Sequence, residues 1–397
     1  MPLPELSTWL VEEIEAKRPI PELFESFCAL LTHRGLPVWR ASLGLEALHP
    51  EESGSLVVWR DGVLDRKPSI ARAGVLTNPS YLNSPTYLVD QSEKPFRWRA
   101  PAASGGLPLI DELAAEGMTD YLMLPLPTLD STRSAVASFA TRVPGGFDEA
   151  AQTELSAASR LITPLAERMI LRQIADNLLQ AYLGKRSGHL VYRGQIERGD
   201  VETITAAILI SDLRGFTALS ESLPRRQVVA LLNRWFDVIG AAIEAQDGEI
   251  LKFLGDGLLA VFPVEAGAAP NTVCDRALQA ALDAASGCER LNAELAGEGH
   301  LPLRFRLALH LGEVEFGNIG TRQRLDFTVI GPAVNHASRI EGATKTLGEP
   351  LVASAVFAAA ATRHPMKALG TLVLRGIEDP VALFAPSRPG PAKADGA

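Results

Sequence analysis

The spacing of apolar residues changes along the chain, and each spacing predicts a different kind of element. From Leu6 to Thr32 the spacing is helical, with a break at Arg18–Pro21 that predicts two helices. A second helical pattern runs from Asp148 to Leu183. Between them, from Val38 to Phe147, short alternating runs separated by Pro, Gly, Asn and Asp predict strands, so this half has an α+β order. The strand candidates are Ser55–Trp59, Tyr121–Leu126 and Ser134–Thr141.

The second half of the chain contains clearer strand patterns. Ile204–Ser211 is a continuous apolar run, as in a buried strand, and Arg304–Leu311 alternates strictly, as in a half-buried one. Lys252–Phe262 contains two apolar strands joined at Asp256-Gly257, a favoured hairpin turn. Phe327–Ile330 is a further short strand, and Gly331-Pro332 ends it.

Three helices are expected to follow these strands. Thr217 is expected to be a helix cap, and Pro224 suits the first turn of the first of these helices, which runs to about Ala245. The second runs from Ala277 to Leu295, and the third starts at Pro332.

These patterns divide the 397 residues into two domains and a linker, and the length of the chain favours the same division. We expect an N-terminal domain over residues 1–147, a coupling helix with its connector over 148–200, and a C-terminal domain over 201–386. Within the linker, Gly184–Gly199 carries Gly, Arg and Ser and is expected to be the connector between the helix and the strand that begins the C-terminal domain. The tail over 387–397 is expected to be disordered.

Composition and charge argue against several classes of protein. The net charge is −9 and no block of Lys and Arg offsets it, which argues against a nucleic-acid partner. No apolar run is long enough to span a bilayer, and the N-terminus shows no signal-peptide pattern. Three separated cysteines, Cys28, Cys274 and Cys288, fit a reducing compartment better than disulfides or a zinc site. We therefore expect a cytoplasmic protein.

Two aspartates at strand ends are the first candidates for chemistry. Asp212 follows the apolar run that ends at Ser211, and Asp256 lies at the tip of the hairpin. Each one alone is more simply explained as a turn residue, because Asp favours such positions. If both close strands at one end of a single sheet, their carboxylates form an all-oxygen site suited to two Mg²⁺ or Mn²⁺ ions. Paired ions of this kind promote in-line displacement at phosphorus.

Two further features would suit a nucleotide. The loop Arg214–Thr217 leads into a helix N-terminus, where free N–H groups favour phosphate. Asn335 and Arg339 are four residues apart on a helix and share a face. They are either a solvated polar stripe or a carboxamide and a guanidinium that position a ribose and stabilise transition-state charge.

Together these stretches resemble the catalytic domain of class III nucleotidyl cyclases, over residues 203–384. Several ordered motifs across nearly a whole domain make this resemblance specific. It implies a ferredoxin-like α/β sandwich and a homodimer in which the metal ligands come from one subunit and the Asn and Arg from the other. The matching stretches are Ser211–Thr217, Lys252–Asp256, His310–Val314, Gly317–Gly320 and Phe327–Arg339.

The resemblance also implies a role for each matched residue. Asp212, Asp256 and the backbone carbonyl of Leu213 would hold the metal ions. Asn335 and Arg339 would be the catalytic residues, orienting the ribose and stabilising charge at the reacting phosphate. Arginine stands at 375, where the family usually has a triphosphate-binding lysine. The residues implied to bind substrate are Lys252, Thr328, Gly215, Phe216, Thr217 and Arg375.

The pair implied to face the base favours adenine. Lys252 has only hydrogen-bond donors, and adenine N1 is an acceptor whereas guanine N1 carries a hydrogen. An unpaired guanine N–H facing the ammonium would cost about 1–3 kcal/mol. Thr328 can donate or accept. Many family members have Asp there, and threonine resembles the subgroup that includes bicarbonate-responsive adenylyl cyclases.

The N-terminal region resembles a sensory domain over about half its length. Gly117–Leu126, the strand after it and the helix entered at Gly146–Asp148 resemble the second half of a GAF domain. No arrangement of Cys or His indicates a chromophore or haem, and His33 and His49 are interpreted as ordinary surface or loop residues. A small-molecule effector of this domain is expected, but the sequence does not identify it.

The expected function is an adenylyl cyclase that converts ATP to cyclic AMP and pyrophosphate at a homodimer interface. The N-terminal domain is expected to regulate it through the helix at 148–183. Two alternatives stay open: a guanylyl cyclase, and a cyclase-like module that binds nucleotide without turnover.

Overall fold

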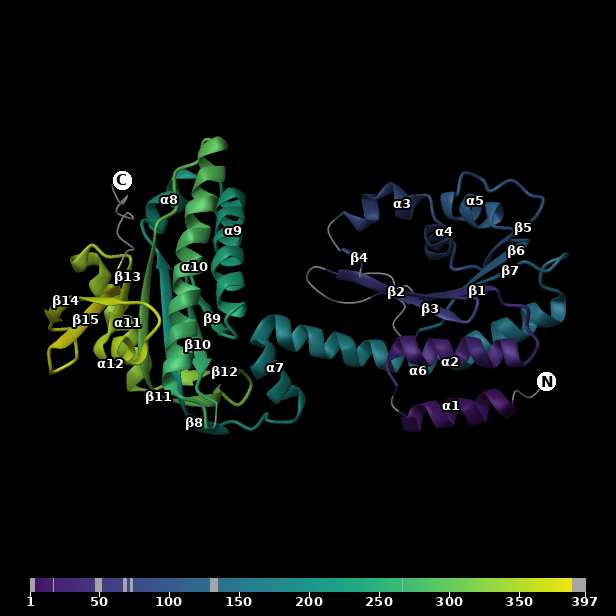
Figure 1. Ribbon diagram of the computed structural model, residues 1–397. Helices are drawn as coiled ribbons and strands as arrows, with labels where there is room; N and C mark the ends of the chain where they lie inside the picture. Colours follow the sequence, from purple (N-terminus) through teal and green to yellow (C-terminus); the bar gives the residue numbers. More distant parts are fainter. Residues whose placement is uncertain are drawn as a thin grey trace, which may run out of the picture. The chain divides into compact units, whose positions relative to one another are not determined.

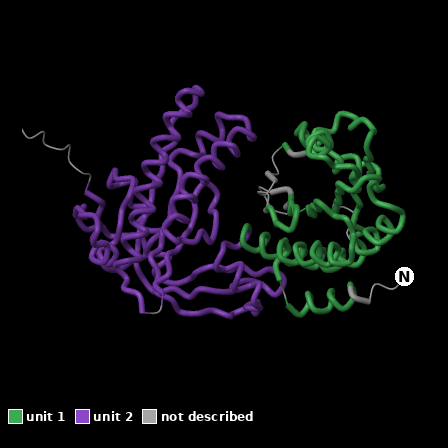
Figure 2. The backbone as a smooth tube through the Cα atoms, turned by 45° about the vertical axis from the view of Figure 1, so that its right-hand side comes forward, with its two compact units in different colours: residues 1–181 green, residues 182–397 purple. Residues whose placement is uncertain are grey.

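The computed structural model describes residues 4–16, 18–46, 52–66, 70–71, 74–128, 135–265 and 267–387, and separates into two compact units. Unit 1 comprises residues 1–181 and unit 2 residues 182–397 (Figure 2). His49, Ser134 and all but the first residue of the predicted tail lie outside the described residues. Over the described ranges, no helix combines the length and apolar character needed to cross a membrane.

Unit 1 is a mixed α+β structure built around an antiparallel sheet (Figure 1). Its helices are α1 (Pro4–Ala16), α2 (Ile20–His33), the 3₁₀ turn η1 (Val75–Thr77), α3 (Pro79–Leu82), α4 (Pro85–Ser92), α5 (Pro108–Ala115) and α6 (Glu149–Leu183), whose last two residues belong to unit 2. Its strands are β1 (Arg40–Glu46), β2 (Glu52–Arg60), β3 (Val63–Arg66), β4 (Ile70–Ala71), β5 (Phe96–Arg99), β6 (Asp120–Pro125) and β7 (Ala135–Thr141).

The strand order of this sheet is β3-β2-β1-β7-β6-β5, with β4 paired to β2. One face packs on α2 and α6, through residues such as Leu43 and Phe27. The other face packs on α4 and α5, through residues such as Tyr121 and Ile110. The predicted break between the first two helices is confirmed, because Pro19 immediately precedes α2 and Pro21 lies in its first turn.

Unit 2 is a second mixed α+β structure. Its helices are α7 (Lys185–Tyr192), α8 (Phe216–Ser222), α9 (Arg225–Glu244), α10 (Pro270–Gly297), α11 (Pro332–Leu347) and α12 (Ala355–Ala360). Its strands are β8 (Val201–Leu213), β9 (Glu249–Leu254), β10 (Gly257–Pro263), β11 (Phe305–Gly320), β12 (Leu325–Ile330), β13 (Leu351–Ser354), β14 (Met366–Leu372) and β15 (Val381–Pro386).

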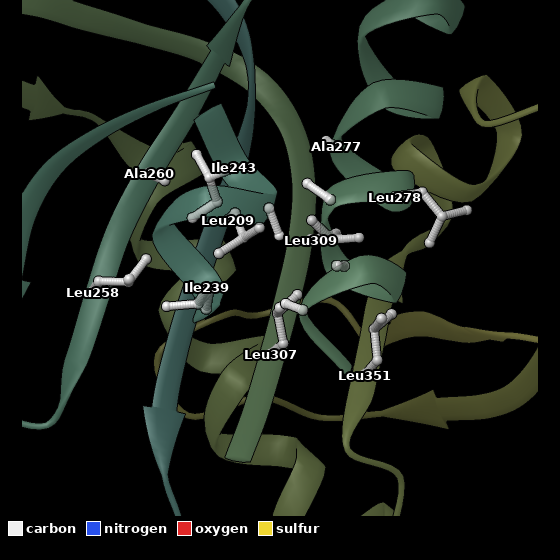
Figure 3. Packing of buried hydrophobic residues seen from close by; sticks show 14 of the residues in the cluster. Leu209, Ile239, Ile243, Leu258, Ala260, Ala277, Leu278, Leu307, Leu309 and Leu351 are labelled. Atoms are coloured by element: carbon white, nitrogen blue, oxygen red, sulfur yellow. The ribbon is translucent and has the colours of Figure 1, made fainter. Parts of the chain in front are cut away.

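The strand order here is β14-β15-β13-β11-β8-β10-β9, with β12 paired to β11. Alternate residues of β8 serve two cores, as strand periodicity requires. Leu209 packs with Ile239 of α9 and Ala277 of α10 (Figure 3). The fully buried Trp235 of α9 belongs to the same cluster. Ile208 packs on the opposite face with α11, through Ala337. The central strand is therefore buried on both sides, which explains its unbroken apolar run.

Several local expectations differ from the structure. The connector contains a helix, α7, because Leu190 and Val191 pack into the core on the α11 side of the sheet. The helix expected to start near Pro224 and run to about Ala245 is confirmed as α9, and a separate short helix, α8, precedes it. Thr217 lies inside α8 and does not cap it.

Candidate active site

The structure brings the two strand-end aspartates together. Strand β8 continues through Asp212, so this residue lies within the strand and not in the loop after it. Leu258 of β10 pairs with Ser211, which sets the β9–β10 turn, and Asp256 in it, beside Asp212. Burial and the neighbouring Asp212 carboxylate raise the pKa of Asp256. The carboxylates therefore lie close enough to repel each other.

Glycine permits this close approach in two ways. The two turn residues are Gly255 and Asp256, not the expected Asp-Gly pair, and Gly255 has a φ of +70°, which favours glycine. At Gly257, a Cβ atom would overlap the backbone carbonyl oxygen of Ser211 and lie 3.4 Å from Oδ1 of Asp212. The hairpin tip can thus lie directly against the end of β8.

A buried arginine, which the sequence did not single out, lies beside this pair. The guanidinium of Arg306 on β11 donates to Oδ2 of Asp212 at 2.6 Å, and its Nε lies 3.3 Å from Oε1 of Glu341 on α11. The Arg306 side chain is 8% exposed. Burial raises the pKa of Glu341, and the carboxylates of Asp212 and Asp256 raise it further, whereas Arg306 opposes the shift. Three carboxylates thus share one buried cation.

This arrangement suits a divalent cation. Within the described residues, no group of three or more His, Cys, Asp or Glu side chains is arranged to hold a metal ion. A metal at Asp212 and Asp256 would therefore rely on two carboxylates plus backbone and substrate oxygens. Adjacent, mutually repelling carboxylates are hard oxygen donors that a divalent cation stabilises, so these residues fit Mg²⁺ or Mn²⁺. Leu213, whose carbonyl is expected to help, is the buried last residue of β8.

Asn335 and Arg339 lie on the face of α11 opposite to the one that contacts Arg306. Both are exposed, on the side of α11 away from buried Ala337. Glu341, which faces Arg306, lies two residues after Arg339 and so about 200° around the helix. The two residues implied to be catalytic therefore point away from the carboxylates on the same chain.

The residues expected to face the base lie on two neighbouring strands. Lys252 on β9 forms an ion pair with Asp326 on β12. Thr328, two residues further along β12, lies on the same face as Asp326 and is 7% exposed. The ion pair therefore brings Lys252 to the strand that carries Thr328. Sequence patterns did not identify Asp326, since an exposed acidic residue before a strand core has many explanations.

The residues expected to bind phosphate lie in two separate places. Gly215 has a φ of +73° and precedes α8, whose first two residues are Phe216 and Thr217. Arg375 is exposed in the turn between β14 and β15, on the far side of β11 and β13 from β8. The structure does not bring Arg375 to the aspartates of its own chain.

Comparison with known proteins agrees with the resemblance found for unit 2. Residues 200–378 match the adenylate and guanylate cyclase catalytic domain. Adenylate cyclase 1 of Rhizobium meliloti is 32% identical over 194 residues, covering 49% of this chain and 28% of that protein. Adenylate cyclase of Anabaena cylindrica is 38% identical over 157 residues, covering 38% and 30%. An uncharacterised protein of Mycobacterium tuberculosis is 32% identical over 240 residues, covering 59% and 41%.

The chain thus spans less than half the length of each of these curated relatives. The resemblance of unit 2 to the adenylate and guanylate cyclase catalytic domain is confirmed over residues 200–378. The N-terminal resemblance to a GAF domain stays a prediction.

Proposed function

We propose that the protein is an adenylyl cyclase that forms cyclic AMP and pyrophosphate from ATP. The observation that carries this proposal is the adjacency of Asp212 and Asp256, in a domain that matches the cyclase catalytic family. Two Mg²⁺ or Mn²⁺ ions at these carboxylates would lower the pKa of the ribose 3′-hydroxyl and neutralise phosphate charge. The 3′-oxygen then bonds to the α-phosphorus, the bond to the bridging oxygen breaks, and the hydroxyl proton passes to water.

The proposed active unit is a homodimer with composite sites. Asn335 and Arg339 are exposed and face away from the aspartates of their own chain. A second copy of the chain can present its own Asn335 and Arg339 to those aspartates, and a two-fold dimer would form two such sites. There the guanidinium would stabilise charge at the reacting phosphate.

Mixing two inactive variants tests this arrangement. Asp212→Ala and Arg339→Ala should each abolish cyclic AMP formation in the presence of Mn²⁺ and ATP. In an equimolar mixture, half the dimers are mixed and each of these has one intact site, so activity should return to about a quarter of the wild-type value. A mixture of Asp212→Ala and Asp256→Ala is the matched control, because both changes damage the same half-site and should restore nothing. Equal activity in both mixtures would contradict a composite site.

ATP is the proposed substrate, and one observation favours GTP as a second candidate. Lys252 offers donors that suit adenine N1, but the Asp326 carboxylate beside it is an acceptor that suits guanine N1–H. If Asp326 only holds Lys252 in place, Asp326→Asn should lower kcat/KM for ATP and leave GTP turnover negligible. A wild-type preference for GTP that Asp326→Asn abolishes would assign the protein as a guanylyl cyclase.

We further propose that unit 1 regulates the catalytic unit through α6. This helix begins beside an ion pair between the buried Asp120 and Arg97, whose side chain is 30% exposed. Arg97 donates to Asp120 at 2.6 Å and to the carbonyl oxygen of Phe147 at 3.0 Å. Asp120 also accepts from the Phe147 N–H, so the sheet of unit 1 is tied to the start of α6. Removal of residues 1–181 should therefore change the basal rate. An unchanged rate and unchanged regulation would refute this coupling.

A further inference from the structure

A charged side chain without a counter-ion lies inside unit 1. Arg40, the first residue of β1, is 7% exposed, and its Nη1 has no hydrogen-bond partner. It forms no ion pair with any residue in the described part of the chain. Burial, the largest cause, lowers the pKa of Arg40. A buried charge is unfavourable unless it is paired, so this guanidinium requires a specific explanation.

Strand register places Arg40 among other polar groups on one face of the sheet. Arg40 pairs with Ala140, and Ala140 pairs on its other side with Tyr121, so only a methyl group separates the two larger side chains. Tyr121 is fully buried, and its hydroxyl, near Ser138, makes no hydrogen bond of normal geometry. In the next row, the hydroxyls of Ser42 and Ser138 are 2.6 Å apart. Donors therefore converge on this face.

The nearby carboxylates do not neutralise Arg40. Glu116, at the end of α5, forms an ion pair with Arg60 at 2.9 Å and lies 3.7 Å from Arg142. Glu112 lies close enough to attract Arg40 but does not pair with it. Glu116 is thus shared with two other arginines, and neither carboxylate forms an ion pair with Arg40. The same face also carries apolar residues, including Trp98 and Met123, which pack in one cluster with residues of α4 and α5. Figure 1 shows these two helices over the sheet.

We propose that this face of unit 1 binds a small molecule through an oxyanion group, a carboxylate or a phosphate. Arg40 is its counter-ion, and the hydroxyls of Tyr121, Ser42 and Ser138 supply further hydrogen bonds. Binding at this site is a property of unit 1 and is independent of the catalytic proposal for unit 2.

Thermal unfolding of the full chain tests the proposal, because four of the five tryptophans lie in unit 1: Trp9, Trp39, Trp59 and Trp98. Tryptophan fluorescence is followed in sodium phosphate, sodium acetate and sodium chloride of equal ionic strength. Phosphate or acetate should raise the melting temperature by about 3 °C or more at ten times its dissociation constant. The two anions distinguish a phosphate ligand from a carboxylate ligand. Arg40→Met should abolish this shift and, in chloride, should melt no lower than the wild type.

Two other variants complete the test. Arg160→Met removes an exposed arginine on α6 and should keep the full anion shift. Tyr121→Phe should keep the fold and require more anion for half of the shift, since it removes one donor. The proposal is overturned if the wild type responds to neither anion, or if Arg40→Met responds as the wild type does. It is also overturned if Arg40→Met melts lower in chloride, because Arg40 would then be a structural residue.

Discussion

Arg306→Gln is the most informative change at the candidate active site. Arg306 is the buried cation shared by Asp212 and Glu341, at 2.6 Å and 3.3 Å. Removal of one partner from a buried ion pair typically costs 3–5 kcal/mol, because a buried charge is left unpaired. Here the side chains of Asp212 and Glu341 are 29% and 16% exposed, so water relieves part of that cost. We expect the metal-free unfolding free energy to fall by about 2–3 kcal/mol.

The same reasoning predicts an unequal response to metal. Without Arg306, a divalent cation at Asp212 and Asp256 supplies the missing positive charge, so Mn²⁺ should stabilise Arg306→Gln more than the wild type. Adding Glu341→Gln removes one of the uncompensated carboxylates and should restore part of the lost stability.

Urea unfolding of the full chain, followed by circular dichroism with and without Mn²⁺, measures both effects. Arg304→Gln is the matched control, because Arg304 is exposed two residues earlier, and it should change stability by about 0.5 kcal/mol or less. The reasoning is refuted if Arg306→Gln is as stable as this control without metal, or if Mn²⁺ stabilises the variant and the wild type equally.

Two further predictions follow from unit 2. Burial, together with His336, lowers the pKa of His310 to about 4, so the unfolded chain binds the additional proton first as the pH falls. The contribution of neutral His310 to the free energy of unfolding is therefore fully present above about pH 6.5, and this free energy should fall by at most about 3 kcal/mol toward pH 4. Urea unfolding at a series of pH values measures this fall, which should be smaller in His310→Gln. Gly257→Ala introduces a Cβ that overlaps the Ser211 carbonyl oxygen, and should cost about 1–3 kcal/mol and weaken Mn²⁺ binding in calorimetry. A variant that binds Mn²⁺ normally would show that the hairpin can move without loss of the site.

Local patterns predicted most elements of the fold. The helix break at Pro19, the buried strand before Asp212 and the hairpin at Asp256 all follow from the spacing of apolar residues and the preferences of Pro and Gly. Spacing failed at α7, because a short segment rich in Gly and Arg becomes helical only when Leu190 and Val191 can pack against a sheet.

The sequence alone also identified the two aspartates, Asn335 and Arg339 as candidate site residues, because strand ends and helical spacing can be recognised from short segments of the chain. Only the tertiary structure decided which distant charges meet. The pairing of Arg306 with Asp212 and Glu341, and of Lys252 with Asp326, depends on strand register. The unpaired burial of Arg40 depends equally on what covers β1. From a single sequence, a charged residue is expected to lie on the surface. Whether it is buried, and whether a counter-ion pairs with it, depends on residues far away in the chain.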